Sequence, residues 1–228
     1  MILLIYVDDI AIFGSSKSLI DQLIFSMRSK FSIKVLGPLH YFLGVELVSN
    51  SDGLLLMQQK YINDILLQFD LANSKHVSTP LHSKQDWHST SSSLLSDPSI
   101  YRQMVGCLQY LAFTRPDIHF AVNLASQFLH QPRQSHLLVV KRIYLYLKGT
   151  SHLGLQLHRK SSHVLTIYSD SDWAGSRSST EAEYRAFSVA AAKATWLQYL
   201  LRDLGVFIAS PIMAKCDNIG AIHLAHNP

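Results

Sequence analysis

The sequence is poor in cysteine and has neither a long apolar run nor a histidine pattern that would bind a metal ion. Its two cysteines, Cys107 and Cys216, have no metal-ligand or disulfide-framework spacing, so a reducing interior is the expected compartment, with nucleus and cytoplasm both open. The apolar residues 1–5 lack a basic leader and run directly into Asp8 and Asp9, which predicts neither a signal peptide nor a membrane span. The 12 histidines form no His-x3-His pair on an evident helix face, so we expect no histidine metal site.

The composition is that of a folded protein. Hydrophobic residues make up 48% of the 228 residues and charged residues 16%, which allows one or two domains with a real core and argues against disorder over most of the chain. The formal net charge of +4, with a pI near 9.0, permits a nucleic-acid partner, although many proteins of this charge bind none.

The first part of the chain predicts small hairpins and short helices. Residues 2–13 are largely β-branched and apolar around the Asp8-Asp9 pair, which predicts two short strands joined by a tight turn. We then expect a helix at 18–31, strands at 41–48 and 54–58 around an Asn-Ser-Asp-Gly turn, and an amphipathic helix at 61–69.

The polar stretch 82–98 is the best linker in the sequence. After it we expect three helical segments, a strand, a long helix and a second strand that leads to Asp217. Their ranges are 101–113, 116–129, 135–148, 163–169, 180–204 and 212–216. Together with the first part, these elements predict a mixed α and β (α+β) fold.

Asp8 and Asp9 are the most informative neighbours in the sequence. Phosphoryl transfer by two divalent cations needs carboxylates fixed at a strand turn, because the metals neutralise charge on the attacking and leaving oxygens together. A solvated turn is the commoner explanation of a bare Asp-Asp pair, since turns favour aspartate. The apolar strands on both sides weaken that explanation.

Several segments, in one order along nearly the whole chain, resemble the Pol polyproteins of copia-type LTR retrotransposons. Residues 6–9, Tyr-Val-Asp-Asp, resemble the metal-binding palm hairpin of reverse transcriptases, and residues 36–44 resemble the segment that enters the primer-grip hairpin. Further similar segments are 78–81, 101–106, 108–111, 114–118, 148–150, 168–175, 181–186 and 216–218. The resemblance implies a C-terminal palm and thumb piece of reverse transcriptase at 1–84, a linker and helical connection at 85–160, and a truncated RNase H-like domain at 161–228.

The resemblance also implies two sets of site residues. Asp8 and Asp9 stand where the family keeps two of its three polymerase carboxylates, and Asp170, Glu183 and Asp217 stand where its RNase H domain keeps three metal-binding carboxylates. The implied cofactor is Mg²⁺ or Mn²⁺, weakly bound. The implied partner is RNA, DNA or an RNA–DNA hybrid, without a membrane or a small-molecule cofactor, and the oligomeric state stays open.

The local pattern agrees with a shared position for the last three carboxylates. A strand bearing Asp170, a helix starting near Thr180 and a strand ending at Asp217 form a βαβ unit, in which the helix start and both strand ends meet at one rim. Thr180-x-x-Glu183 is also a capping box, in which the carboxylate merely satisfies a backbone N–H. The resemblance favours the metal-binding role.

Other features have open interpretations. Lys141, Arg142 and Lys148 suggest a basic face that would contact phosphates, with a solvated helix face as an equally good explanation. Trp173 and Trp196 are expected to be core or interface aromatics.

The sequence departs from the family pattern in three places. Met1 directly precedes the palm hairpin, only four residues join Gly175 to Thr180 where relatives place two more strands, and Pro228 comes before the fourth RNase H carboxylate. We therefore expect a chain that is catalytically incompetent alone. The alternatives are a non-catalytic nucleic-acid-binding or assembly fragment, and a truncated gene model of a fuller Pol polyprotein.

Overall fold

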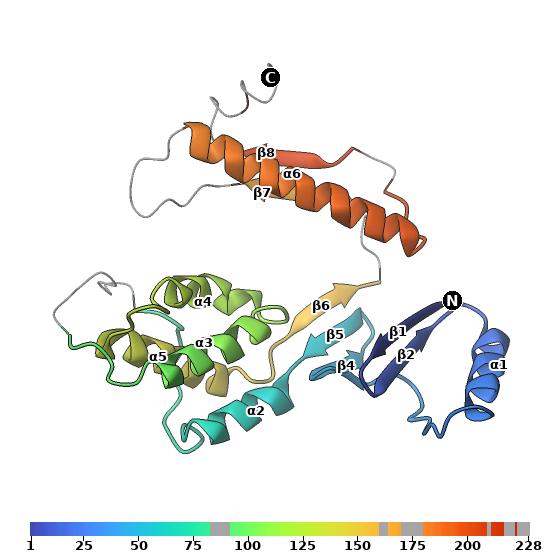
Figure 1. The fold of residues 1–228 in the computed structure, drawn as a ribbon, viewed down its shortest axis with the longest axis horizontal. Coiled ribbons are helices and arrows are strands. Elements are labelled where there is room, and N and C mark those ends of the chain that lie inside the picture. Colours follow the sequence, from blue (N-terminus) through green and yellow to red (C-terminus); the bar gives the residue numbers. More distant parts are fainter. Residues whose placement is uncertain (83–91, 160–163, 170–179, 209–210, 217–221, 223–228) are drawn as a thin grey trace. The chain divides into compact units, whose positions relative to one another are not determined.

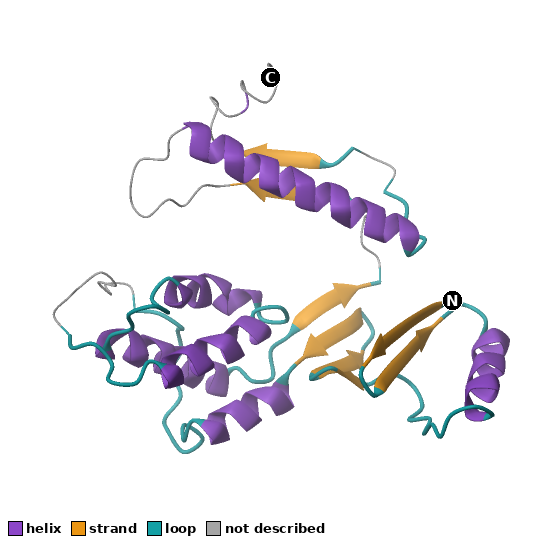
Figure 2. Ribbon diagram, viewed as in Figure 1, coloured by secondary structure: helices purple, strands orange, loops and turns teal. Residues whose placement is uncertain are grey.

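The structure is a computed structural model that describes residues 1–82, 92–159, 164–169, 180–208, 211–216 and 222, with residues 180–183 described by their backbone (Figure 1). The chain separates into two compact units, and the main boundary lies between Arg159 and Lys160. Helices and strands occur in both units (Figure 2), which confirms the mixed α and β class. Among the described residues, no helix combines the length and the apolar character needed to cross a membrane.

The first unit begins with the predicted hairpin. Strand β1 (Ile2–Tyr6) pairs with β2 (Asp9–Phe13) in a two-stranded sheet, and helix α1 (Lys17–Arg28) follows. The Ser16 hydroxyl accepts a hydrogen bond from the Leu19 backbone N–H at 3.4 Å, which satisfies one free donor of the first helical turn. The helix ends three residues earlier than its sequence pattern suggested.

A four-stranded antiparallel sheet forms the centre of this unit. Its order is β3 (Tyr41–Phe42), β4 (Val45–Ser49), β5 (Gly53–Met57) and β6 (Leu155–His158). The predicted Asn-Ser-Asp-Gly turn joins β4 to β5, and the Asn50 side chain accepts hydrogen bonds from the backbone N–H groups of the third and fourth turn residues. The single strand expected at 41–48 is wrong, because a tight turn divides it into β3 and β4.

Strand β6 has no counterpart among the predicted elements. It pairs with β5 along four residues, from Gly53 opposite His158 to Leu56 opposite Leu155. The backbones approach so closely that a Cβ on Gly53 would lie 2.0 Å from the Leu157 carbonyl oxygen. Glycine is therefore required at this position.

A helical core packs beside the sheet (Figures 1 and 2). Its elements are α2 (Gln59–Gln68), α3 (Ser99–Leu111), the 3₁₀ helix η1 (Pro116–Ile118), α4 (His119–Ser126) and α5 (Gln134–Gly149). The helix predicted at 116–129 is thus a 3₁₀ turn followed by a short α-helix. Pro116 opens it, as expected for a residue that has no N–H to donate.

Apolar side chains from α2, α3, α4 and α5 form one continuous core. It includes Ile62, Tyr101, Leu108, Val122 and Ile143, each at most 1% exposed. The described residues of the first two predicted regions, 1–82 and 92–159, consequently lie mainly within one compact unit, because α2 packs on α5 and β5 pairs with β6.

The second unit contains β7 (Thr166–Ser169), α6 (Thr180–Asp203) and β8 (Met213–Cys216). β7 and β8 are parallel neighbours, and α6 packs against β7. Parallel strands need a crossover connection, and α6 lies in that connection. The predicted strand–helix–strand order and the parallel pairing are confirmed.

Candidate functional site

The turn between β1 and β2 presents two carboxylates to solvent. Asp8 lies in the turn and Asp9 opens β2, and both are exposed. Val7, just before them, has a left-handed φ of 49° and is 81% exposed. A β-branched residue in that conformation is uncommon, and such strain is typical of functional turns.

Asp8 and Asp9 have the right chemistry for hard divalent cations, since carboxylate oxygens are the ligands that Mg²⁺ and Mn²⁺ prefer. They supply only part of a coordination shell. Among the residues that the structure describes, no group of three or more histidine, cysteine, aspartate or glutamate side chains is arranged to hold a metal ion.

The turn between β3 and β4 is held against the helical core by a tyrosine from α3. The Tyr110 hydroxyl donates a hydrogen bond to the Leu43 carbonyl oxygen. Leu43 and Gly44 both have left-handed φ values, 49° and 76°. The Tyr110 ring packs edge-to-face on Tyr61 of α2, with ring centroids 5.1 Å apart, so two helices fix the position of this hydroxyl.

Charged groups of β4 and α2 adjoin the same turn. The Glu46 carboxylate accepts a hydrogen bond from the Lys60 backbone N–H at 2.8 Å, and the Lys60 ammonium lies 5.5 Å from the centre of the Tyr41 ring. Burial raises the pKa of Tyr110, and the neighbouring Tyr41 and Tyr6 raise it further. Tyr6 closes β1, just before the Asp8-Asp9 turn.

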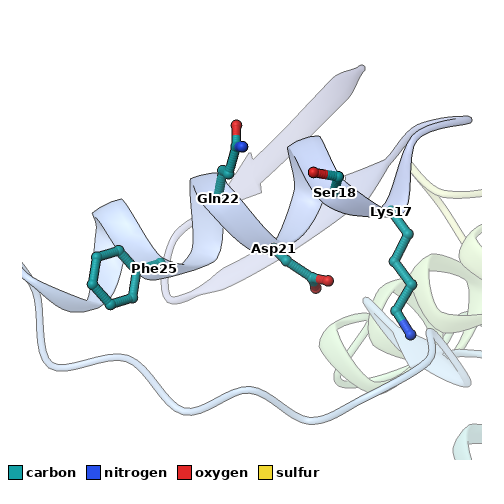
Figure 3. A pocket seen from close by; sticks show the side chains of 5 residues that line it. All are labelled: Lys17, Ser18, Asp21, Gln22 and Phe25. Carbon is teal, nitrogen blue, oxygen red and sulfur yellow. The ribbon is translucent and has the colours of Figure 1, made fainter.

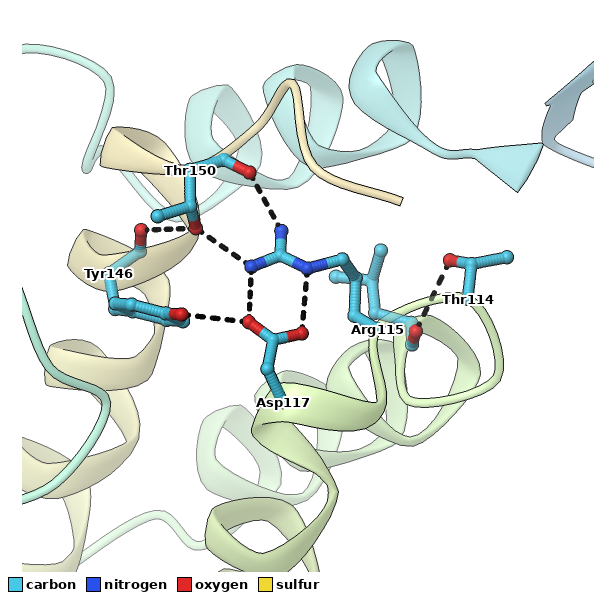
Figure 4. Close-up of polar contacts among 6 residues, drawn as sticks. Thr114, Arg115, Asp117, Tyr146 and Thr150 are labelled. Atoms are coloured by element: carbon cyan, nitrogen blue, oxygen red, sulfur yellow. Dashed lines mark hydrogen bonds and ion pairs between the residues drawn. The ribbon is translucent and has the colours of Figure 1, made fainter. Parts of the chain in front are cut away.

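A buried arginine joins the start of η1 to the end of α5 (Figure 4). The Arg115 side chain is 1% exposed and donates two hydrogen bonds to the Asp117 carboxylate, at 2.9 and 2.7 Å. Two more reach the carbonyl and hydroxyl oxygens of Thr150, at 2.9 and 2.7 Å. The Tyr146 hydroxyl donates to Asp117 at 2.8 Å. Segments 114–118 and 148–150, noted in the sequence as separate, therefore form one structural cluster.

Burial by itself raises the pKa of Asp117. The hydrogen bonds from Arg115 and Tyr146, together with the guanidinium charge, act in the opposite direction and hold the pKa of Asp117 below its usual value. The carboxylate is thus kept ionised as the counter-charge of the buried arginine.

Two of the three residues of the suggested basic face hold a neighbouring segment. Arg142 donates to the Thr79 hydroxyl at 2.8 Å and lies 2.9 Å from His82 Nε2, whereas the Lys148 ammonium donates to the carbonyl oxygens of Ala72 and Ser74, both at 2.6 Å. These contacts fasten residues 72–82 onto α5. Arg142 and Lys148 thus bind residues of the same chain, which neither the phosphate-contacting face nor the solvated face expected from the sequence describes.

An open depression of about 680 Å³ lies along α1 (Figure 3). All of its lining residues come from that one helix, and none of them is a predicted site residue. They are Lys17, Ser18, Asp21, Gln22 and Phe25.

The second predicted site lies largely outside the described residues. Asp170, Asp217 and Trp173 fall there, and Glu183 lies in the first turn of α6, where the backbone alone is described. The residues that precede Asp170 and Asp217, Ser169 and Cys216, are Cα partners in the parallel pair. Trp196 of α6 is 64% exposed, so it does not belong to the core of its unit.

Comparison with known proteins identifies the family. Residues 1–83 match the family of reverse transcriptases (RNA-dependent DNA polymerases). The chain is 39% identical to the Retrovirus-related Pol polyprotein from transposon RE1 of Arabidopsis thaliana, over 99% of this chain and 18% of that protein. It is 34% identical to the Retrovirus-related Pol polyprotein from transposon TNT 1-94 of Nicotiana tabacum, over 100% of this chain and 20% of that protein.

A shorter relative is an uncharacterized mitochondrial protein of Arabidopsis thaliana, which is 42% identical over 86% of this chain and 94% of its own length. The chain thus spans 18% to 20% of the length of the two Pol polyproteins. The alignment with the RE1 polyprotein extends over 256 residues, more than the 228 residues of this chain, so the relative has residues without a counterpart here. No solved structure matches the chain. These similarities show that the chain belongs to the Pol polyprotein family of copia-type retrotransposons, with reverse transcriptase sequence in residues 1–83.

Proposed function

We propose that this chain is the nucleic-acid-binding C-terminal piece of a reverse transcriptase followed by a reduced RNase H-like unit, and that it is catalytically incompetent alone. The observation that carries the proposal is the β1–β2 hairpin with Asp8 and Asp9 at its turn, inside a segment that matches reverse transcriptases. Residues 1–84 contribute the palm hairpin and thumb-like elements, 85–160 the linker and helical connection, and 161–228 the RNase H-like unit.

In this proposal the hairpin serves as a part of a metal site. Asp8 and Asp9 would bind Mg²⁺ or Mn²⁺ through their carboxylate oxygens, and the bound ions would neutralise charge on the phosphates of the nucleic acid. The strained Val7 backbone and the exposed turn direct both carboxylates to solvent, where a nucleic acid has access to them.

The incompetence follows from the number of ligands. An in-line displacement with two metals requires carboxylates that clamp both ions, and Mg²⁺ accepts little departure from octahedral geometry. Asp8 and Asp9 alone leave most coordination positions to water. Metal binding at this hairpin should therefore be weak, and primer extension by this chain alone should not occur.

The register of β7 and β8 supports the RNase H-like part. Ser169 and Cys216 are paired, and each immediately precedes one of the proposed ligands, Asp170 and Asp217. Two parallel strands that end in register carry the chain to one edge of their sheet. Glu183, in the first turn of α6, would supply the third carboxylate at that rim.

The test uses the purified 228-residue chain and a primer–template with a recessed 3′ end. With Mg²⁺ or Mn²⁺ we expect no primer extension, together with weak binding that lacks sequence preference. The logarithm of the binding constant should fall with the logarithm of salt concentration, with a slope of about −0.9 for each phosphate contact. An exposed acidic residue of α1, Asp21, gives the matched control variant Asp21→Asn.

Two outcomes would contradict the proposal. Template-dependent extension that disappears in Asp8→Asn and persists in Asp21→Asn would show a complete polymerase site. Failure to bind any primer–template at low salt would exclude the nucleic-acid-binding role.

A second candidate is an assembly role without nucleic-acid binding. It is favoured by apolar side chains that the first hairpin and α1 expose to solvent, among them Ile5 at 65% and Phe25 at 78%. Exposed apolar residues of this kind are typical of surfaces covered by another protein segment. Binding of the primer–template distinguishes the two candidates.

A further inference from the structure

Thr79 lies on the segment that α5 holds, and its hydroxyl is in contact with an arginine. The Arg142 Nη2 donates a hydrogen bond to Thr79 Oγ1 at 2.8 Å, and this hydroxyl donates to the Leu81 carbonyl oxygen at 3.0 Å. Residues 71–82, all of them described, form neither helix nor strand, and Thr79 is exposed. An enzyme that modifies hydroxyl groups can therefore reach Thr79 from solvent.

A proline directly follows Thr79. One large class of serine and threonine kinases requires proline at this position, and Pro80 also favours extended backbone at Thr79, the form in which peptide segments enter a kinase cleft. The sequence has two such pairs, Thr79-Pro80 and Ser210-Pro211. Ser210 lies outside the described residues, so Thr79 is the candidate whose surroundings the structure shows.

Arg142 has an unused donor beside the Thr79 hydroxyl. Its Nη1 donates to His82 Nε2 at 2.9 Å and its Nη2 to Thr79, whereas its buried Nε has no hydrogen-bond partner among the described residues. Nε and Nη2 form the edge of a guanidinium that binds an anion through two parallel hydrogen bonds. Arg115 uses the same edge to hold both carboxylate oxygens of Asp117.

The charges around Thr79 favour an added anion. Residues 71–85 contain no aspartate or glutamate, and helix α5 contains none either. The same two stretches contain five lysines and arginines: Lys75, Lys84, Lys141, Arg142 and Lys148. No carboxylate on either element competes with a phosphate for the Arg142 guanidinium.

We propose that Thr79 is a phosphorylation site of a proline-directed protein kinase, and that Arg142 binds the phosphate through Nε and Nη2. In the reaction the Thr79 oxygen attacks the γ-phosphorus of a nucleoside triphosphate and the bond to the β-phosphate oxygen breaks. The hydroxyl proton passes to the kinase, and the nucleoside diphosphate leaves. Phosphothreonine carries a charge of about −1.5 to −2 at neutral pH, so its hydrogen bonds to Arg142 fasten residues 72–82 to α5 more firmly than the hydroxyl does.

The experiment uses the full chain with Ser210→Ala, which leaves Thr79 as the acceptor that proline follows. A purified cyclin-dependent kinase with ATP and Mg²⁺ supplies the modification, and peptide mass spectrometry locates it. Amide hydrogen exchange at Val77 reports how firmly the segment is attached, because this amide donates to the Leu145 carbonyl oxygen of α5 at 3.3 Å. The Leu47 amide of β4 is the reference.

We expect one phosphoryl group at Thr79, and loss of this incorporation in Thr79→Ala. Phosphorylation should slow exchange at Val77 about tenfold relative to Leu47, the change that corresponds to one charge-assisted hydrogen bond. Arg142→Lys keeps the positive charge and removes the guanidinium edge, so phosphorylation should then slow Val77 by less than about threefold. Each variant is compared with its own unphosphorylated form, which cancels a general loss of stability.

Three outcomes would overturn the proposal. The first is a folded chain in which the kinase leaves Thr79 unmodified. The second is a phosphorylated chain in which exchange at Val77 is as fast as before, and the third is equal slowing in the parent chain and in Arg142→Lys. None of these results depends on nucleic-acid binding, so the proposed function is tested separately.

Discussion

Replacement of Arg115 by methionine should destabilise the first unit strongly. Arg115→Met keeps much of the side-chain length and removes the charge together with four hydrogen bonds, two to Asp117 and two to Thr150. Removal of one partner from a buried ion pair costs about 3–5 kcal/mol, mostly because the other charge is left without compensation.

The structure places this variant at the lower end of that range. The Asp117 side chain is 34% exposed, and it keeps the hydrogen bond from the Tyr146 hydroxyl, so water and one donor still stabilise its charge. We therefore expect a loss of about 3 kcal/mol in the free energy of unfolding. For a unit of this size, that lowers Tm by roughly 6–12 °C.

Urea unfolding followed by circular dichroism measures the effect. The midpoint should fall without a change in slope, because the surface exposed on unfolding is the same. The control is Arg102→Met, in which an exposed arginine loses one hydrogen bond, to the Leu129 carbonyl. That substitution should cost less than about 1 kcal/mol.

A double-mutant cycle with Asp117→Asn completes the test. Once Arg115 is gone, neutralising Asp117 removes an uncompensated charge, so the double variant should be more stable than the sum of the single losses by about 1–3 kcal/mol. Additive losses within about 0.5 kcal/mol, or a loss below about 1 kcal/mol in Arg115→Met, would refute the account of this cluster.

Three further predictions concern stability. The pKa of Asp117 in the folded state lies below its unfolded value of about 3.9. Its contribution to the free energy of unfolding is therefore present above that pH and is lost as pH falls through the folded pKa. The acid unfolding curve of Asp117→Asn should lack this pH-dependent loss of stability. Lys148→Met should cost about 2 kcal/mol at low and high salt alike in urea unfolding, because its partners are backbone carbonyls rather than charges. Gly53→Ala should lower the free energy of unfolding by more than about 1 kcal/mol, because the added Cβ clashes with a β6 carbonyl. Gly106→Ala, on the open face of α3, should be neutral or stabilising. Equal effects of the two alanines would contradict this explanation.

Local patterns predicted the elements that depend on local physics. The β1–β2 hairpin, the Asn50 turn and the long helices all follow from alternation, turn chemistry or helical spacing, which operate within a few residues. The predicted strand–helix–strand order of the second unit also appears, with β7 and β8 parallel. The short connections and the alternating order of strands and helix were sufficient to predict this arrangement of the second unit.

Elements that depend on distant partners were not predictable from those patterns. β6 is a four-residue strand that forms by pairing with the edge of β5, about 100 residues earlier in the sequence. The turn between β3 and β4 accepts a hydrogen bond from Tyr110 of α3, and the buried Arg115 donates to Thr150 at the end of α5. In the same way, Arg142 and Lys148 form hydrogen bonds with residues 72–82. The helical spacing of α5 carries no information about these partners.

For the candidate site residues too, the local features were predictable from the sequence and the contacts with distant residues were not. The sequence placed Asp8 and Asp9 at a strand turn, and the structure has them there. The contacts of Tyr41, Lys60 and Tyr110 at the β3–β4 turn were not predicted, because they join this turn to two helices that follow later in the sequence. The convergence of Asp170, Glu183 and Asp217 stays a prediction.

The pairing of β6 with β5 also sets the order of events during synthesis on a ribosome. Leu54, Leu55 and Leu56 can form their last ladder only after Leu155, Gln156 and Leu157 have been made. At roughly 5–20 residues per second, the intervening stretch of about 100 residues takes about 5–20 seconds to translate. Throughout that interval β5 has an open edge, which is a template for pairing with other chains. Truncated translation products that end before residue 155 should therefore aggregate more readily than the chain that includes β6.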